Sequence, residues 1–466
     1  MTELETWELR AEFAQRLSAM YGREVPAYNT LVEVSTEVNE AYVAKHGAEA
    51  ERLGSISRVT AERHGAIRVG SPREMAQVAR IFAAFGMYPV GFYDLRDASS
   101  SSVPVVSTAF RPIDGAELAK NPFRVFTSML AAEDPRFFDR ELRAELAEFI
   151  GARQLFGSEL LGLADRAAGS GGLPTDDAEQ LLELATAAFE LSGDPVDYEW
   201  YKRLEAVSAV ASDIGGVSTT HINHLTPRVL DIDELYQRMQ ARGISMIDEI
   251  QGPPRWDGPD LLLRQTSFRA LGEHRVFRYA DGSTNEGELR VRFGEVEARG
   301  IALTVAGRDL YDRMVAESDA RLALAPAGTT RVEVAAGVWA EHLPRTEKEL
   351  ALQGLAFFTY RLDDEALDGA PLTGTASLTD LIEAGIAVPE PIVYEDFLPR
   401  SAAGIFQSNL TEEGSKDNEQ TGTSYDIHRM SQIVGSEVHD PNDLYRRQQD
   451  DSIAVLARRL NITVTR

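Results

Sequence analysis

The order of hydrophobic and polar residues between positions 64 and 95 predicts a strand, a helix and a second strand. This segment reads HGAIRVGSPREMAQVARIFAAFGMYPVGFYDL. Apolar residues recur at helical spacing after Ser71 and Pro72, which favour a helix start, and Gly86 marks the helix end. We therefore expect a strand–helix–strand unit that begins at His64.

A second segment repeats this order later in the chain. It reads INHLTPRVLDIDELYQRMQARGISMIDEIQGPP. Its first strand carries His224, Asp231 or Asp233 can cap the helix, Gly243 ends it, and ISMIDEI forms the next strand. Both segments contain the spacing His-x-x-x-Arg-Val. We interpret this as a weak internal repeat that would direct two histidines toward one point.

Changes in this pattern divide the chain into four parts. Residues 55–114 hold the first strand–helix–strand unit, which is half of a module. Helical periodicity and the flexible stretch AAGSGGLPTDD predict a helical insertion over 115–215. Strand alternation with Asp-Gly turns predicts a βαβββ module over 216–305, and a C-terminal α/β part over 306–466 completes the pocket. We interpret 1–466 as a single elaborated domain.

The chain has a net charge of −27 and contains no cysteine. This charge repels a phosphate backbone, so we expect no nucleic-acid partner and no anionic membrane partner. The lack of cysteine excludes disulfides, thiolate nucleophiles and cysteine-ligated metals. No apolar run approaches the ~20 residues of a membrane span, and the N-terminus lacks the features of a secretory signal. We expect a globular cytoplasmic protein that would hold any metal with imidazole and carboxylate.

Common catalytic signatures are absent, which directs attention to the histidines. The sequence has no phosphate-binding loop, no nucleophile elbow and no His-Glu-x-x-His helix. The segment LRVRFGEVEARGIALT reads as one strand with two acids on an otherwise apolar face. Buried acids need a positive partner, and a divalent metal bound by two imidazoles and one carboxylate, as in non-haem Fe(II) oxygenases, supplies one. The candidate ligands are His64, His224 and either Glu295 or Glu297, with His221 as a competitor.

Four stretches of the chain resemble, in this order, the bacterial 2-oxoadipate dioxygenase/decarboxylases, also called 2-hydroxyglutarate synthases. They are ERHGAIR, THINHLTPRVLDID, FGEVEARGIALT and YEDFLPRSAAGIFQSNL. The two strand–helix–strand units also resemble modules of the vicinal oxygen chelate superfamily, in which paired βαβββ units curl into a half-barrel around a metal. The resemblance implies an α+β fold: a vicinal-oxygen-chelate-like half-barrel of βαβββ modules with a large helical insertion and additional helices. It also implies that the single domain is catalytic.

The same resemblance implies the reaction. A single Fe(II) would bind a 2-oxo diacid through its keto oxygen and adjacent carboxylate, with O2 beside it. Decarboxylation and hydroxylation of the same molecule would convert 2-oxoadipate to 2-hydroxyglutarate and CO2, a step of lysine breakdown. His64, His224 and Glu295 are implied as the iron ligands. Glu295 ranks above Glu297 because Phe-x-Glu-Val-x-x-Arg is similar to the final strand of 4-hydroxyphenylpyruvate dioxygenases, where the first glutamate binds iron.

Substrate-binding residues are implied as well. Arg68 is implied as the catalytic residue that grips a substrate carboxylate through two parallel hydrogen bonds. It follows His64 by four residues, so it lies on the same strand face, ~13 Å farther along. Arg228 has the same relation to the second histidine and is the weaker candidate. The small residues that begin with Ser401 and Ala402 could bring backbone N–H groups to a substrate carboxylate.

Two other functions remain open at this point. A metal-dependent isomerase or lyase of the same superfamily would use Zn, Ni or Mn as a Lewis acid without O2, and would usually have a fourth protein ligand. A non-catalytic small-molecule binder would keep the half-barrel and lack the metal. Metal analysis and O2 consumption distinguish these functions from the dioxygenase.

Overall fold

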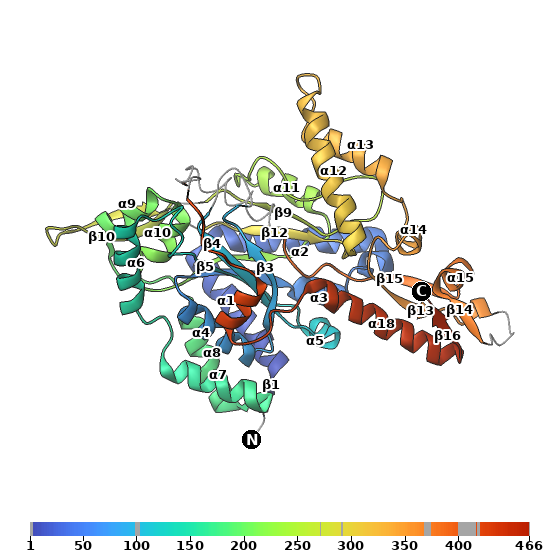
Figure 1. Ribbon diagram of the computed structural model, residues 1–466, viewed down its shortest axis with the longest axis horizontal. Coiled ribbons are helices and arrows are strands. Elements are labelled where there is room, and N and C mark those ends of the chain that lie inside the picture. Colours follow the sequence, from blue (N-terminus) through green and yellow to red (C-terminus); the bar gives the residue numbers. More distant parts are fainter. Residues whose placement is uncertain are drawn as a thin grey trace.

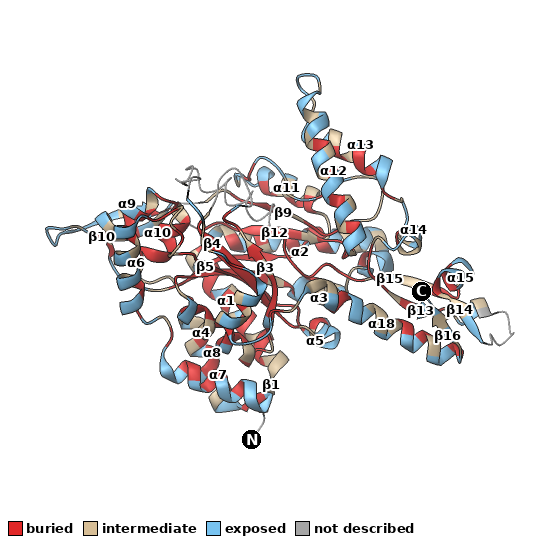
Figure 2. Cartoon of the chain, in the orientation of Figure 1, coloured by how far each residue is buried: buried red, intermediate tan, exposed pale blue. Residues whose placement is uncertain are grey.

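The computed structural model in Figure 1 describes residues 3–97, 103–270, 272–289, 292–367, 374–398, 416 and 420–465. These residues form a mixed α+β fold with several small sheets and one sheet of five strands in the order β3-β4-β5-β2-β8. Its strands are β2 (Arg63–Val69), β3 (Tyr88–Asp94), β4 (Val105–Arg111), β5 (Arg124–Leu130) and β8 (Ile222–Pro227). Figure 2 shows that buried residues concentrate in this central sheet.

The predicted strand–helix–strand unit is confirmed as β2, α4 (Pro72–Ala84) and β3. The Ser71 side chain caps the helix by accepting a hydrogen bond from the Glu74 backbone N–H. β4 and β5 complete a βαβββ unit in the same sheet. Strand β5 lies within 115–215, where we predicted helices. All of its residues are buried, so it lacks the alternation that identifies a half-buried strand.

Helices predominate between β5 and β8. They are α6 (Arg140–Ala152), α7 (Ser158–Ser170), α8 (Thr175–Ala187), α9 (Tyr198–Glu205) and α10 (Ala209–Gly215), while the short α5 (Gly115–Lys120) joins β4 to β5. Helix α7 packs against α4, and α8 packs against α1 (Thr6–Glu24). Three short strands, β1 (Glu3–Glu5), β6 (Gly172–Pro174) and β7 (Val196–Asp197), lie at the edges of this part. These helices therefore cover the first βαβββ unit.

The second repeat starts as predicted with β8 and α11 (Ile232–Ala241), but two later predictions are wrong. The predicted strand at 244–250 forms only an isolated bridge, between Met246 and Phe268. The Ile247 N–H donates to the Ser267 carbonyl, while the Ile247 carbonyl accepts from the Tyr236 hydroxyl. The predicted continuous strand from Leu289 is divided in two, because the chain leaves a β-hairpin before it re-enters a sheet.

The strands of this second part form two ladders. The hairpin consists of β10 (Glu273–Arg278) and β11 (Thr284–Leu289), and the other ladder pairs β9 (Leu263–Ser267) with β12 (Glu295–Arg299). Strand β12 also lies beside β8, since the Val229 backbone N–H donates to the Glu297 carbonyl at 2.8 Å. The ladder of β9 and β12 is therefore placed next to the edge of the five-stranded sheet.

The C-terminal part has its own hydrophobic core, which includes the buried Trp339, Leu350, Phe358 and Leu456. Its elements are α12 (Val305–Ala323), α13 (Arg331–His342), α14 (Glu347–Leu352), β13 (Phe358–Leu362), η2 (Glu365–Leu367), β14 (Thr375–Ser377), α15 (Leu378–Glu383), β15 (Ala387–Pro391), α17 (Ile427–Val434), α18 (Pro441–Leu460) and β16 (Thr463–Thr465). In Figure 1, α12 and α13 project away from the central sheet. Helix α17 packs against α4. Thus part of the C-terminal region returns to the first βαβββ unit.

The N-terminal helices pack beneath both repeats. Besides α1 they are α2 (Pro26–His46), the short η1 (Gly47–Glu51) and α3 (Ile56–Ala61). On α1, the buried Tyr21 hydroxyl lies 3.0 Å from the Asn223 carbonyl oxygen and 2.9 Å from that of Phe293. Tyr21 therefore links β8 to the segment that enters β12. Among the described helices, none combines the length and apolar character needed to cross a bilayer.

We expect Tyr21→Phe to lower the free energy of unfolding by about 1–3 kcal/mol, because two buried carbonyl groups lose their shared hydroxyl donor. Chemical denaturation followed by circular dichroism measures this change. Tyr28→Phe is the control, because the Tyr28 hydroxyl contacts only the partly buried Ser18 hydroxyl among the hydrogen bonds observed. Equal stabilities of the two variants would contradict the link that we assign to Tyr21.

Candidate metal centre

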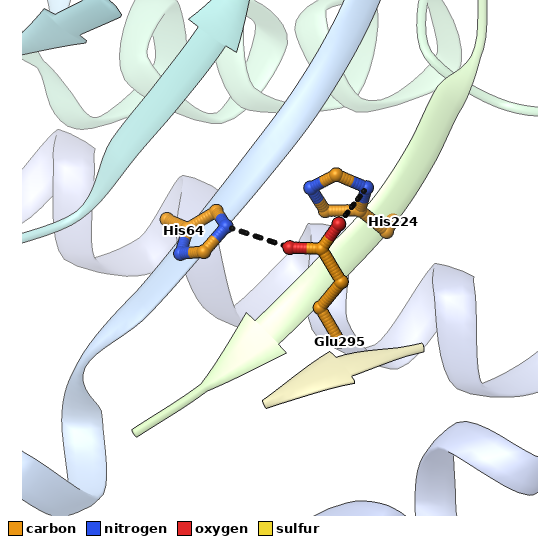
Figure 3. Close-up of side chains that lie close together, drawn as sticks. All are labelled: His64, His224 and Glu295. Atoms are coloured by element: carbon orange, nitrogen blue, oxygen red, sulfur yellow. Dashed lines mark ion pairs between the residues drawn. The ribbon is translucent and has the colours of Figure 1, made fainter. Parts of the chain in front are cut away.

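His64, His224 and Glu295 converge from three strands, β2, β8 and β12 (Figure 3). Glu295 lies between the two imidazoles: its Oε2 is 3.5 Å from His64 Nε2, and its Oε1 is 3.4 Å from His224 Nδ1. Each residue offers a ligand atom, and these atoms all lie within 4.8 Å of one another. All three side chains are buried. The three residues can therefore reach a single metal ion together.

Strand pairing explains why these residues meet. β2 and β8 are antiparallel neighbours, and His224 lies opposite Ala66, two residues beyond His64. The two imidazole rings consequently face the same side, with centroids 5.5 Å apart and planes at 84°. Strand β12 runs beside β8, with a parallel bridge between Arg228 and Glu297. This bridge places Glu295 next to both histidines.

Aromatic rings enclose the centre. The Phe397 ring is perpendicular to the His64 ring at 5.0 Å, and the Phe293 ring lies 5.5 Å from the His224 ring. The Phe126 ring contacts the Phe397 ring, with centroids 5.0 Å apart. Such a lining excludes water and strengthens the electrostatic interactions of the centre.

The surroundings shift the pKa values of the two histidines in opposite directions. Burial lowers the pKa of His224 to about 4, although the Glu295 carboxylate opposes this shift. Burial acts in the same direction on His64, but the adjacent carboxylates of Glu297 and Glu295 outweigh it and raise the His64 pKa above its ordinary value. At neutral pH His224 is therefore a neutral imidazole, the form that binds metal ions.

Glu297, the alternative acid, lies behind His64. Its Oε2 is 2.9 Å from His64 Nδ1, the ring nitrogen that does not face Glu295. Arg299 donates two hydrogen bonds to this carboxylate, at 2.7 and 2.9 Å, and Arg124 adds a third at 3.3 Å. Burial raises the pKa of Glu297, but Arg299, His64 and Arg124 hold it down at about 2. Of the two acids, Glu295 is thus the one that contacts both imidazoles.

Glu297 belongs to a larger group of buried charges, which we name the ionic cluster. It consists of Arg58, Arg124, Arg228, Arg299, Glu62, Glu297 and Glu395. Arg124 contacts all three glutamates, and nearby arginines hold the pKa values of Glu62 and Glu395 below their usual range despite burial. The acids of the ionic cluster are therefore ionised at neutral pH.

The residues at the centre fit a divalent metal ion. His224 Nδ1 is fully buried and has no hydrogen-bond partner among the described residues, although it faces the Glu295 carboxylate. Buried polar atoms without such partners are rare in folded proteins, and a bound cation accounts for this one. Two nitrogen ligands and one oxygen ligand also match the set that binds Fe(II) in non-haem oxygenases.

A second group with suitable ligand atoms lies on the surface, at Glu317, Glu341 and His342. Arg321 donates hydrogen bonds to both glutamates of this group. The arginine supplies the positive charge that a metal would otherwise provide, so we interpret this group as a solvated ion-pair network.

Arg68 is buried and paired with Asp213, a residue of α10. Asp213 also accepts a hydrogen bond from the Asn223 amide at 2.9 Å and lies 3.4 Å from His221 Nε2. The positive charge of Arg68 contributes to the lowered pKa of His224. Asp213 links the Arg68 guanidinium to Asn223, the residue that precedes His224. His221, the competing ligand, contacts Asp213 and Asn223 instead of Glu295.

The remaining predicted residues are not brought to this centre by the described part of the structure. Arg228 belongs to the ionic cluster, where it pairs with Glu62 at 2.8 Å and donates to the Leu53 carbonyl. Ser401 and Ala402 lie outside the described residues.

Reasoning from the sequence missed other residues around the centre, notably Asp213, Arg124, Glu395 and Phe397. They come from separate parts of the chain and share no spacing with the histidines. The one available signal was the stretch YEDFL, whose two acids stand between aromatic residues at 394–398.

Comparisons with known proteins all indicate one family. A family model described as 2-oxoadipate dioxygenase/decarboxylase matches residues 13–409. A Mycobacterium tuberculosis protein named 2-oxoadipate dioxygenase/decarboxylase is 55% identical over 95% of this chain and 96% of its own length. A Pseudomonas putida protein of the same name is 41% identical over 97% of each chain. The crystal structure of the Pseudomonas putida hydroxyglutarate synthase in complex with 2-oxoadipate superposes with a TM-score of 0.82, at 38% identity, over 98% of this chain and 99% of that one.

We expect His224→Ala to abolish binding of one divalent metal ion per chain, because it removes one of three converging ligands. Metal analysis of protein that has been loaded without O2 and then dialysed provides the measurement. His221→Ala is the matched control on the same strand region and should retain the metal. A result in which His221→Ala loses the ion while His224→Ala keeps it would show that the ligand assignment is wrong.

Proposed function

The chain belongs to the 2-oxoadipate dioxygenase/decarboxylase family, and we propose that it converts 2-oxoadipate and O2 to 2-hydroxyglutarate and CO2 at one Fe(II) ion. The ligands of this ion are His64, His224 and Glu295. The observation that carries the proposal is the convergence of these three buried side chains in a chain 55% identical to a protein named for this reaction. The reaction would serve lysine breakdown.

The ligand set suits an anionic substrate. Metal binding requires both imidazoles to be neutral, so two imidazoles and one carboxylate leave a bound divalent ion with a net positive charge, which attracts the carboxylate of a 2-oxo acid. Three protein ligands also leave positions for the substrate and for O2. When bound, Fe(II) supplies the electrons that activate O2 and a template that holds O2 and the 2-oxo acid side by side. No oxidisable thiol lies near this chemistry, because the chain has no cysteine.

The aromatic lining provides the dry surroundings that this chemistry needs. Phe397 and Phe293 contact the two ligand imidazoles, so they limit water access to the open positions. Exclusion of water favours hydroxylation of the decarboxylated substrate over escape of reactive species.

Arg68 is proposed to bind the carboxylate of the substrate that is distant from the keto group. The keto acid end occupies the metal, so only the far carboxylate remains for an arginine. Support comes from the burial of Arg68 and from its electrostatic effect on His224. Asp213 holds the guanidinium from the α10 side. We propose that backbone N–H groups at Ser401 and Ala402 also contact a substrate carboxylate.

We also propose that the two repeats form a half-barrel like that of the vicinal oxygen chelate superfamily. The units β2-α4-β3-β4-β5 and β8-α11-β9-β12 support this arrangement, because they meet where β2 pairs with β8. In this interpretation residues 1–466 are one catalytic domain and the C-terminal part completes the pocket. Glu395 of that part belongs to the ionic cluster, and Phe397 contacts His64.

The decisive experiment is to load the protein with Fe(II) without O2 and then add 2-oxoadipate and air. We expect O2 uptake, CO2 release and 2-hydroxyglutarate formation in equal amounts. A metal-dependent isomerase or lyase would leave O2 unconsumed, and a non-catalytic binder would leave 2-oxoadipate unchanged. Either result would overturn the proposal.

We expect Arg68→Ala to raise the KM for 2-oxoadipate by about 10- to 100-fold, because a charge-assisted hydrogen bond to a carboxylate is lost. Bound metal should stay at the wild-type level. Steady-state O2 consumption measures KM, and Arg80→Ala is the control, since Arg80 is paired with Asp165 on the surface. An unchanged KM in Arg68→Ala would remove Arg68 from the substrate site.

A further inference from the structure

The nitrogen of His64 that faces away from Glu295 has a carboxylate of its own. Glu297 Oε2 lies 2.9 Å from His64 Nδ1, while His64 Nε2 is the atom directed toward Glu295. Neither side chain is exposed to solvent by more than 1%. This contact has the length of a hydrogen bond but not its angle, so it acts as a charge contact. A carboxylate beside Nδ1 favours the proton on that nitrogen and leaves Nε2 as the lone-pair atom for a metal.

We propose that Glu297 is a positioning residue that fixes the ring orientation and tautomer of His64 for metal binding, and that Arg299 fixes Glu297 in turn. This inference rests on the proposed metal centre. It assigns Glu297 no ligand bond of its own.

The contacts of Arg299 show why Glu297 cannot turn away from His64. Arg299 Nε and Nη2 donate to the two oxygens of Glu297, at 2.7 and 2.9 Å, which fixes the plane of the carboxylate. Arg299 Nη1 donates to the backbone carbonyls of Tyr394 and Asp396, at 2.7 and 3.1 Å. Both ends of this arginine are therefore held.

The segment 394–396, which binds Arg299, is itself held by ion pairs of Glu395 and Asp396. Glu395 pairs with Arg124 and Arg58, while Asp396 accepts two hydrogen bonds from Arg111, at 2.8 and 3.0 Å. The next residue, Phe397, contacts the His64 ring. The C-terminal part therefore acts on the same metal ligand twice, through Arg299 and Glu297 on one side and through Phe397 on the other.

A matched pair of residues elsewhere in the fold allows a clean test. Glu74 is also buried, and Arg153 donates to its two oxygens in the same way, from Nε at 2.8 Å and from Nη2 at 2.9 Å. Glu74 contacts no histidine among the described residues. Glu74→Gln therefore reproduces the loss of a buried carboxylate bound by arginine without touching His64.

The test measures metal affinity, not turnover. Mn(II) dissociation constants are determined by competition with a chromophoric chelator for the wild type, Glu297→Gln and Glu74→Gln. We expect Glu297→Gln to weaken Mn(II) binding by about 10- to 100-fold and Glu74→Gln to leave it near the wild-type value. Glu297→Asp provides a second variant, which keeps the charge but draws the carboxylate back from His64, and it should also weaken binding.

A second readout reports on the tautomer directly. In protein loaded with Zn(II) and labelled with nitrogen-15 at histidine, the Nδ1 proton of His64 should be protected from exchange in the wild type and exposed to it in Glu297→Gln. Equal affinities of the wild type and both Glu297 variants would overturn the inference, as would an equal loss in Glu74→Gln. Failure of the wild type to bind Mn(II) or Zn(II) would instead overturn the proposed function.

Discussion

The buried ionic cluster behind His64 is the interaction on which the arrangement of the candidate metal ligands depends. Glu62, Glu297 and Glu395 are all buried, and an ionised carboxylate is costly there without a cation nearby. Arg124 of β5 contacts all three. Its guanidinium therefore links β5 to the N-terminal region through Glu62, to β12 through Glu297 and to the C-terminal part through Glu395. Buried ion pairs add little net stability, yet loss of one partner is strongly destabilising. The cluster therefore serves mainly to hold charged side chains in fixed positions.

Strand β2 connects the ionic cluster to the candidate metal ligands, because it carries His64, which contacts Glu297. It pairs with β5 on one side and with β8 on the other, so His64 lies in the middle of the sheet rather than at an edge. The ladder between β2 and β8 is irregular after Ala66, directly opposite His224. Irregularities of this kind bend a strand and redirect side chains, and they are common beside functional sites. The result is that imidazoles from two repeats face one glutamate.

The sequence predicted the parts of this arrangement that have periodic patterns. The repeated His-x-x-x-Arg-Val spacing identified β2 and β8, and strand alternation placed Glu295 and Glu297 on one face, where both now contact His64. Alternation could not separate the roles of the two glutamates. Their difference arises because Arg299 binds Glu297 and is itself held by the carbonyls of Tyr394 and Asp396, which are distant in the sequence. Strand β5 escaped prediction because it is buried on both faces, and Asp213 because a helix far along the chain delivers it to Arg68.

The charge balance of the ionic cluster ties the C-terminal part to the two repeats. Four arginines face three glutamates, and one of those glutamates, Glu395, comes from the C-terminal part. Without Glu395, Arg58 and Arg124 would both lose a carboxylate partner, and their mutual repulsion would disturb the contact between Arg124 and Glu297. The repeats contribute the three candidate ligands, but the C-terminal part neutralises the charges that hold those ligands in place. The geometry of the candidate metal centre therefore depends on the C-terminal part as well as on the two repeats.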